Sequence, residues 1–362
     1  MIRNKLAIFA LTLLAAGVLF SAPTGLLYAD SGDEAEEYLF YPLPPDLPRF
    51  QFLASFSSPL DVSSGKSGFR DFVFGGEDKE DHLVEKPYGV AIHEGAIYVV
   101  DTRGAGWVIF DLANRRSAVV RPKGGGTLKK PINIAIDDDG NRYVTDTERE
   151  QVLVYDRQNR FLKAYGEPGQ FKPIDVAIAG DRLYVSDAMH HEVHVLEKST
   201  GKTLLSFGGR GSEPGEFNNP TNLALAGDDT LYVVDTINFR VQQFTPEGEF
   251  IRQFGEAGAV PGTFSRPKGI SVDREGHIYV VDSAFENIQV FAQDGGALMF
   301  FGAPGNGRDS INMPTAIKLD YDNVPYFEKY VAPDFDIEYL VLVANQFGNN
   351  KVTVFGFGSR RD

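Results

Sequence analysis

The chain of 362 residues contains no cysteine. This absence excludes disulfide bonds, a cysteine nucleophile, thiolate-ligated metal clusters, lipidated cysteines and haem attached through a cysteine motif. The remaining composition is ordinary for a globular protein, with 43% hydrophobic and 23% charged residues, so a large core is available. The 38 glycines and 20 prolines predict many tight turns.

Positive charge is also scarce, since the net charge is -15. An acidic protein cannot neutralise a phosphate backbone, so we expect no nucleic-acid partner. The nucleophile motif G-x-S-x-G is missing. Gly65-Lys66-Ser67 lacks the leading glycine of a phosphate-binding loop, because Leu60 stands in that place. Asp137-Asp138-Asp139-Gly140 lacks the glutamate that completes a calcium loop and is predicted to be a hairpin turn.

The N-terminal segment is typical of export. Arg3 and Lys5 precede an uninterrupted apolar run of 15 residues, Leu6 to Phe20, which is short for a membrane span. We predict a signal peptide over residues 1–29; an uncleaved N-terminal anchor is the alternative, and the only membrane contact that we expect. The protein is then periplasmic or extracellular. Residues 30–48 are acidic and proline-rich, and are predicted to form an extended linker.

The rest of the chain repeats itself. Prolines recur every 42 to 47 residues, at Pro87, Pro131, Pro173, Pro220, Pro267 and Pro314. Each proline is followed three residues later by an aliphatic residue, and the first five units add a tyrosine and then an aspartate at the end of a short apolar run. Such runs are β-branched and aromatic and too short for helices. A regular period of this length indicates a repeat architecture.

These landmarks resemble the NHL repeat, P-x-G-I-A-V-D…Y-V-x-D-x-x-N-x-R-V-Q-V-F…F-x-x-x-F-G, best in the fourth and fifth units. The resemblance covers roughly residues 87–356. It implies an all-β fold, a six-bladed β-propeller. Blades packed radially bury both faces of each sheet and leave only short edges.

The sixth unit lacks a fourth strand. Its three expected strands, Thr315–Leu319, Tyr339–Val343 and Val352–Phe355, are followed by the chain end. We therefore predict that residues 49–56 complete this blade and close the ring, which removes exposed strand edges. Residues 57–86 are predicted to be a loop with a short helix or lid at Phe69–Phe74. The 322–337 insertion, with Tyr326 and Phe327, is interpreted either as a partner site or as a plug over the seam.

The repeated aspartates are predicted to cap turns, because a carboxylate after a strand accepts backbone N–H groups and a catalytic residue is normally singular. They are Asp101, Asp146, Asp187, Asp235 and Asp282. The side chains two residues after each proline are predicted to point into the central channel, where three blades present Asn133, Asp175 and Asn222. This trio is a candidate calcium site; the alternative is that it holds ordered water.

Two enzyme groups bear on this channel by resemblance. Gluconolactonase and strictosidine-synthase relatives hold a metal or substrate near the propeller axis with acidic and amide residues. The peptidyl-amidating lyases share the NHL propeller and bind zinc through histidines from several blades. The channel positions here carry no histidine, so that activity is disfavoured. His190, His191 and His194 straddle a loop and a strand, so we do not expect their imidazoles to share a face or bind zinc.

Loops between second and third strands carry large side chains that are candidates for a partner surface. They are Arg103, Met189, His190, Phe239, Phe285 and Phe347, with Phe239 and Phe285 interpreted as equivalent positions of adjacent blades. Because no singular catalytic set emerges, the favoured interpretation is an exported, non-catalytic scaffold without a cofactor. The resemblance to exported NHL propellers implies protein partners in the cell envelope, such as a multihaem cytochrome complex. The alternative is a metal-dependent hydrolase or lyase with a central-channel site.

Overall fold

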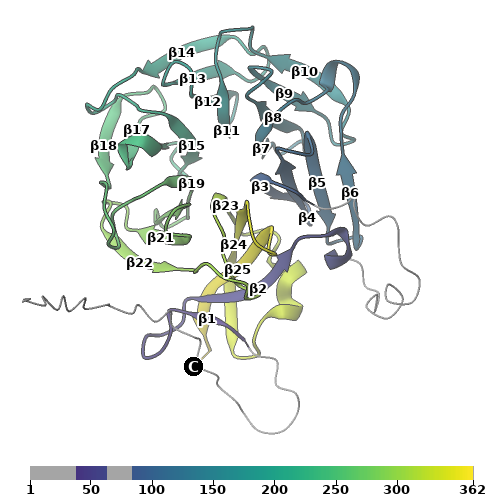
Figure 1. The fold of residues 1–362 in the computed structure, drawn as a ribbon, viewed down its shortest axis with the longest axis vertical. Helices are drawn as coiled ribbons and strands as arrows, with labels where there is room; N and C mark the ends of the chain where they lie inside the picture. Colours follow the sequence, from purple (N-terminus) through teal and green to yellow (C-terminus); the bar gives the residue numbers. More distant parts are fainter. Residues whose placement is uncertain (1–37, 63–83, 362) are drawn as a thin grey trace, which may run out of the picture. The chain divides into compact units, whose positions relative to one another are not determined.

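A computed structural model describes residues 38–62 and 84–361. In the unit Tyr38–Asp362, strands form six antiparallel sheets around a central axis (Figure 1). The prediction of an all-β six-bladed propeller is thereby confirmed. The predicted signal peptide and the Phe69–Phe74 helix lie outside the described residues.

Each blade runs outward from the axis. The innermost strands are β3 (Pro87–His93), β7 (Pro131–Ile136), β11 (Pro173–Ala179), β15 (Pro220–Leu225), β19 (Pro267–Val272) and β23 (Pro314–Asp320). The second strands are β4 (Ala96–Asp101), β8 (Arg142–Asp146), β12 (Arg182–Asp187), β16 (Leu231–Asp235), β20 (Ile278–Asp282) and β24 (Phe335–Asn345). The third strands are β5 (Gly106–Asp111), β9 (Gln151–Tyr155), β13 (Glu192–Glu197), β17 (Arg240–Phe244), β21 (Asn287–Phe291) and β25 (Val352–Arg360). The outer strands are β6 (Arg116–Val120), β10 (Phe161–Tyr165), β14 (Thr203–Gly208), β18 (Phe250–Phe254), β22 (Ala297–Phe301) and, in the last blade, β2 (Phe50–Phe56).

The core lies between the blades. All residues of β4, β16 and β20 are buried, as expected for strands covered on both faces. The repeated tyrosine of each second strand packs against the neighbouring blade; Tyr232, for example, shares a cluster with Ile270 and Phe291. Apolar runs with β-branched residues therefore supply the interfaces that hold the ring together.

The ring closes through the N-terminal strand. β2 pairs with β25, with Phe50 opposite Phe357 and Phe56 opposite Val352. Phe50 stacks on Phe301 of blade five at 4.1 Å, and Phe56 packs on Phe110 of blade one at 5.5 Å. The closing strand thus fastens the last blade to both of its neighbours. Part of the predicted linker is also ordered, since Phe40–Tyr41 forms a fifth strand (β1) beside β2.

Helical structure in the described part is limited to 3-10 turns. They are η1 (Pro59–Val62), η3 (Gly124–Gly126), η4 (Thr236–Asn238) and η5 (Val324–Tyr330). Across residues 38–62 and 84–361, no helix combines the length and apolar character needed to cross a membrane.

Candidate functional site

A β-bulge at the start of every innermost strand shapes the central channel. In β11, Pro173 pairs with Asp187 and the register then shifts before Val176 pairs with Val185. The same shift follows the proline of blades one, two, four and five, whereas in blade six pairing resumes one residue earlier, at Ala316. The bulge removes the second residue after the proline from the ladder, so the N–H of Asp175 is instead donated to the Ser186 hydroxyl at 3.0 Å. Bulges of this kind aim side chains at sites.

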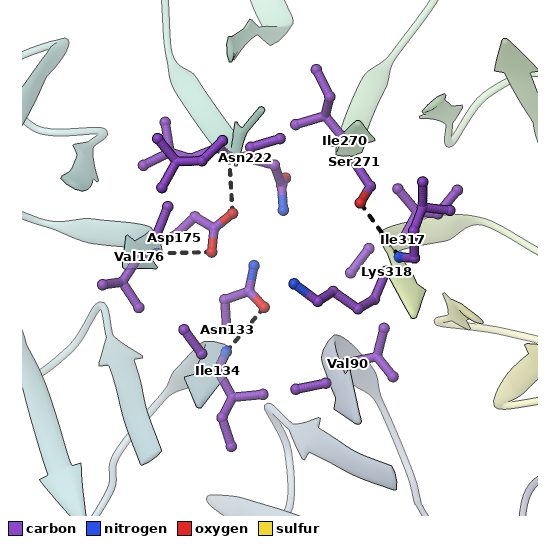
Figure 2. Close-up of a pocket in the computed structure, with 18 of the residues that line it drawn as sticks. Val90, Asn133, Ile134, Asp175, Val176, Asn222, Ile270, Ser271, Ile317 and Lys318 are labelled. Atoms are coloured by element: carbon purple, nitrogen blue, oxygen red, sulfur yellow. Dashed lines mark hydrogen bonds between the residues drawn. The ribbon is translucent and has the colours of Figure 1, made fainter. Parts of the chain in front are cut away.

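Asn133, Asp175 and Asn222 line a cavity of about 330 Å³ on the axis, as predicted from their position. The residue two places further along each strand also lines it: Ala91, Ala135, Ala177, Ala224, Ser271 and Lys318. Figure 2 shows Lys318 reaching across the channel towards Asn133 and Asp175. Sequence reasoning missed this lysine. Side chains alternate along a strand, so the fourth residue after each proline should face the channel as the second does. Five of these six positions are alanine or serine, and the lysine in the sixth could have been recognised from the sequence.

Asp175 is the acidic group of the cavity and is only 7% exposed. Its Oδ1 accepts the N–H of Val176 at 2.8 Å, and its Oδ2 accepts the N–H of Leu223 from the next blade at 2.9 Å. Burial raises the pKa of Asp175 to about 7, although these bonds, the Lys318 charge and the Asn222 amide act in the opposite direction. A carboxyl group that ionises near neutral pH is suited to acid–base catalysis.

Three other side chains of the cavity, those of Asn133, Asn222 and Lys318, direct nitrogen donors into it. The Oδ1 of Asn133 accepts the N–H of Ile134 at 3.0 Å, which leaves its amide nitrogen facing the channel (Figure 2). The amide of Asn222 also points its nitrogen inward, while its buried Oδ1 has no hydrogen-bond partner among the described residues. Together with the Lys318 ammonium, these donors surround the space beside Asp175.

This donor set does not fit the expected calcium ion. Calcium takes six to eight oxygen ligands. Here both oxygens of Asp175 already accept backbone N–H groups, the amide nitrogens of Asn133 and Asn222 face the centre, and Lys318 brings a positive charge into the same space. The cavity therefore favours an anionic or oxygen-rich organic ligand.

Two further ionisable groups follow the prolines of blades one and five. Burial raises the pKa of Tyr88, and the charge of Asp175 adds to this effect, so Tyr88 is a neutral phenol. Burial, with a smaller contribution from Arg266, lowers the pKa of Lys268 to about 8. The sequence analysis named neither residue, and neither is among the residues that line the cavity.

The five repeated aspartates all hold turns at one end of the blades. Asp282, for example, accepts N–H groups of Ser265 and Arg266 before β19 and of Ala284 and Phe285 after β20. Corresponding backbone bonds are made by Asp101, Asp146, Asp187 and Asp235. Each carboxylate therefore ties the start of an innermost strand to the end of the second strand.

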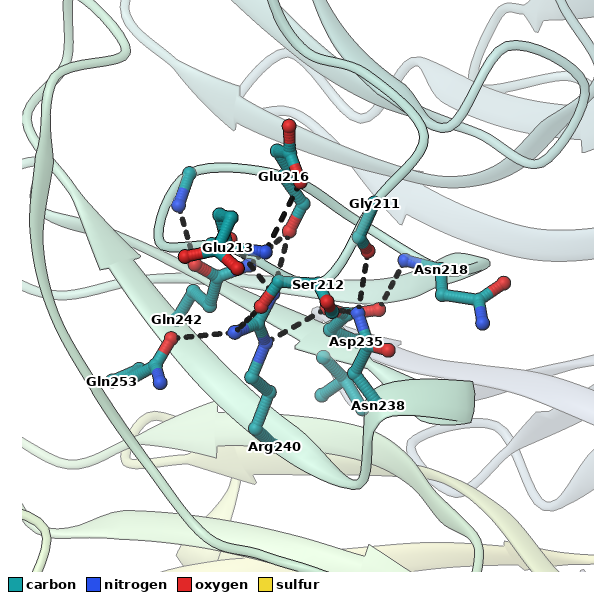
Figure 3. Close-up of polar contacts among 12 residues, drawn as sticks. Gly211, Ser212, Glu213, Glu216, Asn218, Asp235, Asn238, Arg240, Gln242 and Gln253 are labelled. Atoms are coloured by element: carbon teal, nitrogen blue, oxygen red, sulfur yellow. Dashed lines mark hydrogen bonds and ion pairs between the residues drawn. The ribbon is translucent and has the colours of Figure 1, made fainter.

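Blade four adds a guanidinium to this arrangement (Figure 3). Arg240 donates to Asp235 at 2.9 Å and to the carbonyls of Ser212 and Glu216 at 2.7 and 2.8 Å. Gln242 also donates to the Glu216 carbonyl, at 2.7 Å. The N-x-R-V-Q part of the repeat thus anchors the loop that leads into blade four.

In blade three, histidines replace that network. His190 Nδ1 lies 2.6 Å and His194 Nε2 lies 3.1 Å from Oδ2 of Asp187. The expectation that these imidazoles lie apart is wrong, because the loop folds His190 back over the carboxylate. His191 is separate, with its Nδ1 accepting the N–H of Asn219. The sequence analysis named Asp187 as a turn cap but did not place it beside these two imidazoles.

The predicted loop-tip surface is only partly formed. Met189 and Phe347 are exposed, and Arg103 is paired with Glu85 at 3.4 Å. Phe239 and Phe285 are not equivalent, because Phe239 has a left-handed φ of 56° and the residue with that conformation in blade five is Glu286. Phe239 instead packs into the core between blades four and five.

The blade-six insertion seals the seam. Phe327 is fully buried and packs on Phe56 of the closing strand, so its assignment to a partner surface is wrong. Gln51 donates to the Tyr330 carbonyl at 2.8 Å and accepts the Ala332 N–H at 3.0 Å. Tyr326 is 39% exposed and covers Gly95 of blade one.

Comparisons with known proteins agree with the fold. A family model described as a 6-bladed beta-propeller matches residues 218–300. Peptidylglycine alpha-amidating monooxygenase of Rattus norvegicus is 29% identical over 201 residues, which cover 50% of this chain and 19% of that protein. A probable peptidyl-alpha-hydroxyglycine alpha-amidating lyase of Caenorhabditis elegans is 29% identical over 147 residues, covering 37% of this chain and 42% of that protein.

A gluconolactonase structure from Xanthomonas campestris superposes with a TM-score of 0.56 at 15% identity, covering 90% of this chain and 99% of the other. This likeness shows the fold alone, and the chain spans less than half the length of the two sequence relatives. Those relatives are nevertheless enzymes. The predicted non-catalytic scaffold is therefore wrong, as is the expectation that the protein is not an enzyme; the central-channel enzyme is the better supported alternative.

Proposed function

We propose that the protein is a lyase whose active site is the central channel, with Asp175 as the acid–base group. The observation that carries this proposal is a carboxyl group with a pKa of about 7 inside a cavity of about 330 Å³. Half of such groups are ionised at neutral pH, so Asp175 can both take and return a proton. The sequence relatives favour a lyase over a hydrolase, because one of them is named for that reaction.

The substrate class follows from the relative's name and the donors of the channel. A peptidyl α-hydroxyglycine carries a carboxylate, a hydroxyl and an amide nitrogen on one carbon. Lys318 and the Asn133 amide supply a charge and a hydrogen-bond donor for the carboxylate. We assign the same kind of substrate here, a small N-acylated α-hydroxy acid that enters the cavity by its carboxylate end.

In this reaction the ionised Asp175 accepts the hydroxyl proton. The oxygen electrons form a C=O bond, the C–N bond breaks, and the protonated Asp175 returns its proton to the nitrogen. The products are an amide and glyoxylate, so atoms and charge balance without a second reactant. The Asn222 amide, which points its nitrogen into the channel, is assigned to stabilise the negative charge that develops on oxygen, while Lys318 holds the carboxylate. The sequence disfavours this activity because the channel lacks zinc-binding histidines, and none lines the cavity. The mechanism proposed here needs none: Asp175 moves the proton, and no step is assigned to a metal ion because the channel donors do not fit one.

The test is release of glyoxylate from N-benzoyl-α-hydroxyglycine by the purified chain. We expect turnover in the wild type that survives dialysis against a chelator, and a loss of about 100-fold or more in Asp175→Asn. Lys318→Met should raise KM more than it lowers kcat, because it removes a binding charge. Ser271→Ala, on another wall of the same channel, should retain activity.

Two results would refute the proposal in different ways. Wild-type protein that leaves this substrate intact would overturn the lyase assignment and its substrate class. Turnover that persists in Asp175→Asn would leave the lyase in place but move its active site away from the channel. Activity that is lost with the chelator and restored by calcium would overturn the metal-independent mechanism.

The N-terminal sequence supports export to the periplasm or cell exterior as part of this proposal. Arg3, Lys5 and the apolar run from Leu6 to Phe20 have the order of a signal peptide. Expression in a bacterial host followed by fractionation should place the mature chain outside the cytoplasm, with its N-terminus near residue 30. Retention of the full-length chain in the membrane fraction would identify an anchor instead.

A further inference from the structure

The second-to-third-strand turn of blade three departs from that of blade four at all three polar positions of the N-x-R-V-Q motif, and at the middle one Glu192 stands in place of Arg240. Counted from the capping aspartate, His190 replaces Asn238 of blade four and His194 replaces Gln242. In blade four, Asn238 and Arg240 donate to Asp235 and Gln242 anchors the preceding loop. Blade three instead turns two imidazoles towards Asp187. Because the turn in blade four is held without histidine, a structural role alone does not require this pair.

The three groups are close and differ in exposure. The Nδ1 of His190, the Nε2 of His194 and a carboxylate oxygen of Asp187 all lie within 4.8 Å of one another. The side chains of Asp187 and His194 are 0% and 9% exposed, while that of His190 is 43% exposed. The cluster is therefore rigid on its inner side and open to solvent on the side of His190.

The surroundings prepare the inner two groups to bind a cation. Burial opposes ionisation of Asp187, but hydrogen bonds from His194, from the Lys172 and Met189 N–H groups and from His190 outweigh it and lower its pKa to about 2. The carboxylate is thus charged at any physiological pH. The Nδ1 of His194 lies 2.9 Å from the Ser206 hydroxyl, which orients the ring and leaves its Nε2 facing Asp187.

We propose that Asp187, His190 and His194 form a binding site for a divalent transition-metal ion, Zn²⁺ in particular. Two imidazoles and one carboxylate are a set that zinc accepts, with a fourth position left for water. Tetrahedral zinc with bonds of about 2.0–2.1 Å places its ligand atoms about 3.3 Å apart. His190 must then retreat by less than about 1 Å from its present 2.6 Å, and its exposed loop position permits this movement.

A second group of possible ligands, Asp273, Glu275 and His277, lacks these features. The Oδ2 of Asp273 accepts the Tyr339 hydroxyl as well as facing His277, whereas the Oδ2 of Asp187 faces the two imidazoles. The group contains one imidazole rather than two. Blade three is therefore the stronger zinc site of the described residues.

The experiment is a zinc titration by calorimetry of the whole tag-free chain, after dialysis against a chelator. We expect one ion per chain, and binding at least tenfold weaker in both His190→Ala and His194→Gln. Ser206→Ala, which removes only the orienting hydroxyl, should weaken binding by about 10-fold or more. Asn238→Ala, the blade-four position equivalent to His190, should bind as the wild type does.

Cobalt substitution supplies a readout that a hydrogen-bonded turn cannot give. A bound Co²⁺ ion in tetrahedral N/O coordination should produce visible absorption bands that are lost in His194→Gln. Absence of zinc binding by the wild type overturns the proposal, as does binding that persists in both histidine variants. The site owes nothing to the channel chemistry, so a chain that binds zinc but releases no glyoxylate would refute only the lyase proposal.

Discussion

The buried carboxyl group of Asp175 makes a prediction that is independent of any substrate. Its pKa of about 7 in the folded chain exceeds the 3.8 of an unperturbed aspartate. Because the folded-state pKa is the higher one, ionisation destabilises the fold. Asp175 therefore makes its full contribution to the unfolding free energy below pH 3.8. This contribution falls as the pH rises from 3.8 to 7, and above pH 7 the unfolding free energy changes no further on account of this group.

The magnitude follows from this shift. The folded-state pKa of Asp175 exceeds its unperturbed pKa by 7 − 3.8, or about 3 pH units. The loss of unfolding free energy that corresponds to about 1 of these units has already occurred at pH 5. Between pH 5 and pH 8.5 the remaining 2 units correspond to about 3 kcal/mol at 1.36 kcal/mol per unit. Asp175→Asn removes this dependence, because an amide does not ionise. At pH 5 the variant should be less stable by about 1–3 kcal/mol, since the Leu223 N–H loses its acceptor.

The assay is denaturant unfolding of both proteins at pH 5 and pH 8.5, followed by circular dichroism. The difference in unfolding free energy between wild type and Asp175→Asn should change by about 3 kcal/mol in favour of the variant as pH rises. Asp181→Asn, an exposed aspartate of the same blade, is the control and should parallel the wild type. Parallel curves for Asp175→Asn would show that the carboxyl group ionises at its ordinary pKa and would undermine its acid–base role.

Two further predictions concern the scaffold. Phe50→Ala should lower the unfolding free energy by about 3–5 kcal/mol, because Phe50 is fully buried between blades five and six. The control Phe250→Ala, at a partly exposed position, should lower it by about 1 kcal/mol. Equal losses would mean that the closing strand does not seal the ring. Arg240→Met should cost about 3–5 kcal/mol, because it leaves the buried Asp235 carboxylate without its charged partner and takes the guanidinium donor away from the Ser212 carbonyl; the exposed Arg160→Met should cost less than about 1 kcal/mol. Denaturant midpoints measure both, and a small effect of Arg240→Met would show that the network is replaceable.

The architecture was predictable because the repeat period gives the number of blades and the short apolar runs give the strands of each blade. The missing fourth strand of the sixth unit even located β2, since an incomplete blade must take a strand from elsewhere. The boundaries of this blade were not predictable. β24 and β25 extend to Phe335 and Arg360 because they pair with each other beyond the repeat. Phe40–Tyr41 is ordered by contacts with Phe335, Phe301 and Phe355, which no local pattern encodes.

Functional groups of a propeller are recognised by comparing equivalent positions between blades. At the fourth position after the proline, four alanines and one serine leave Lys318 as the single charge. At the turn after the second strand, His190 and His194 stand where blade four has Asn238 and Gln242. Repetition explains residues that recur from blade to blade, such as the five capping aspartates. A residue that only one blade carries has no such explanation, so its role must be sought in the channel or turn that it faces.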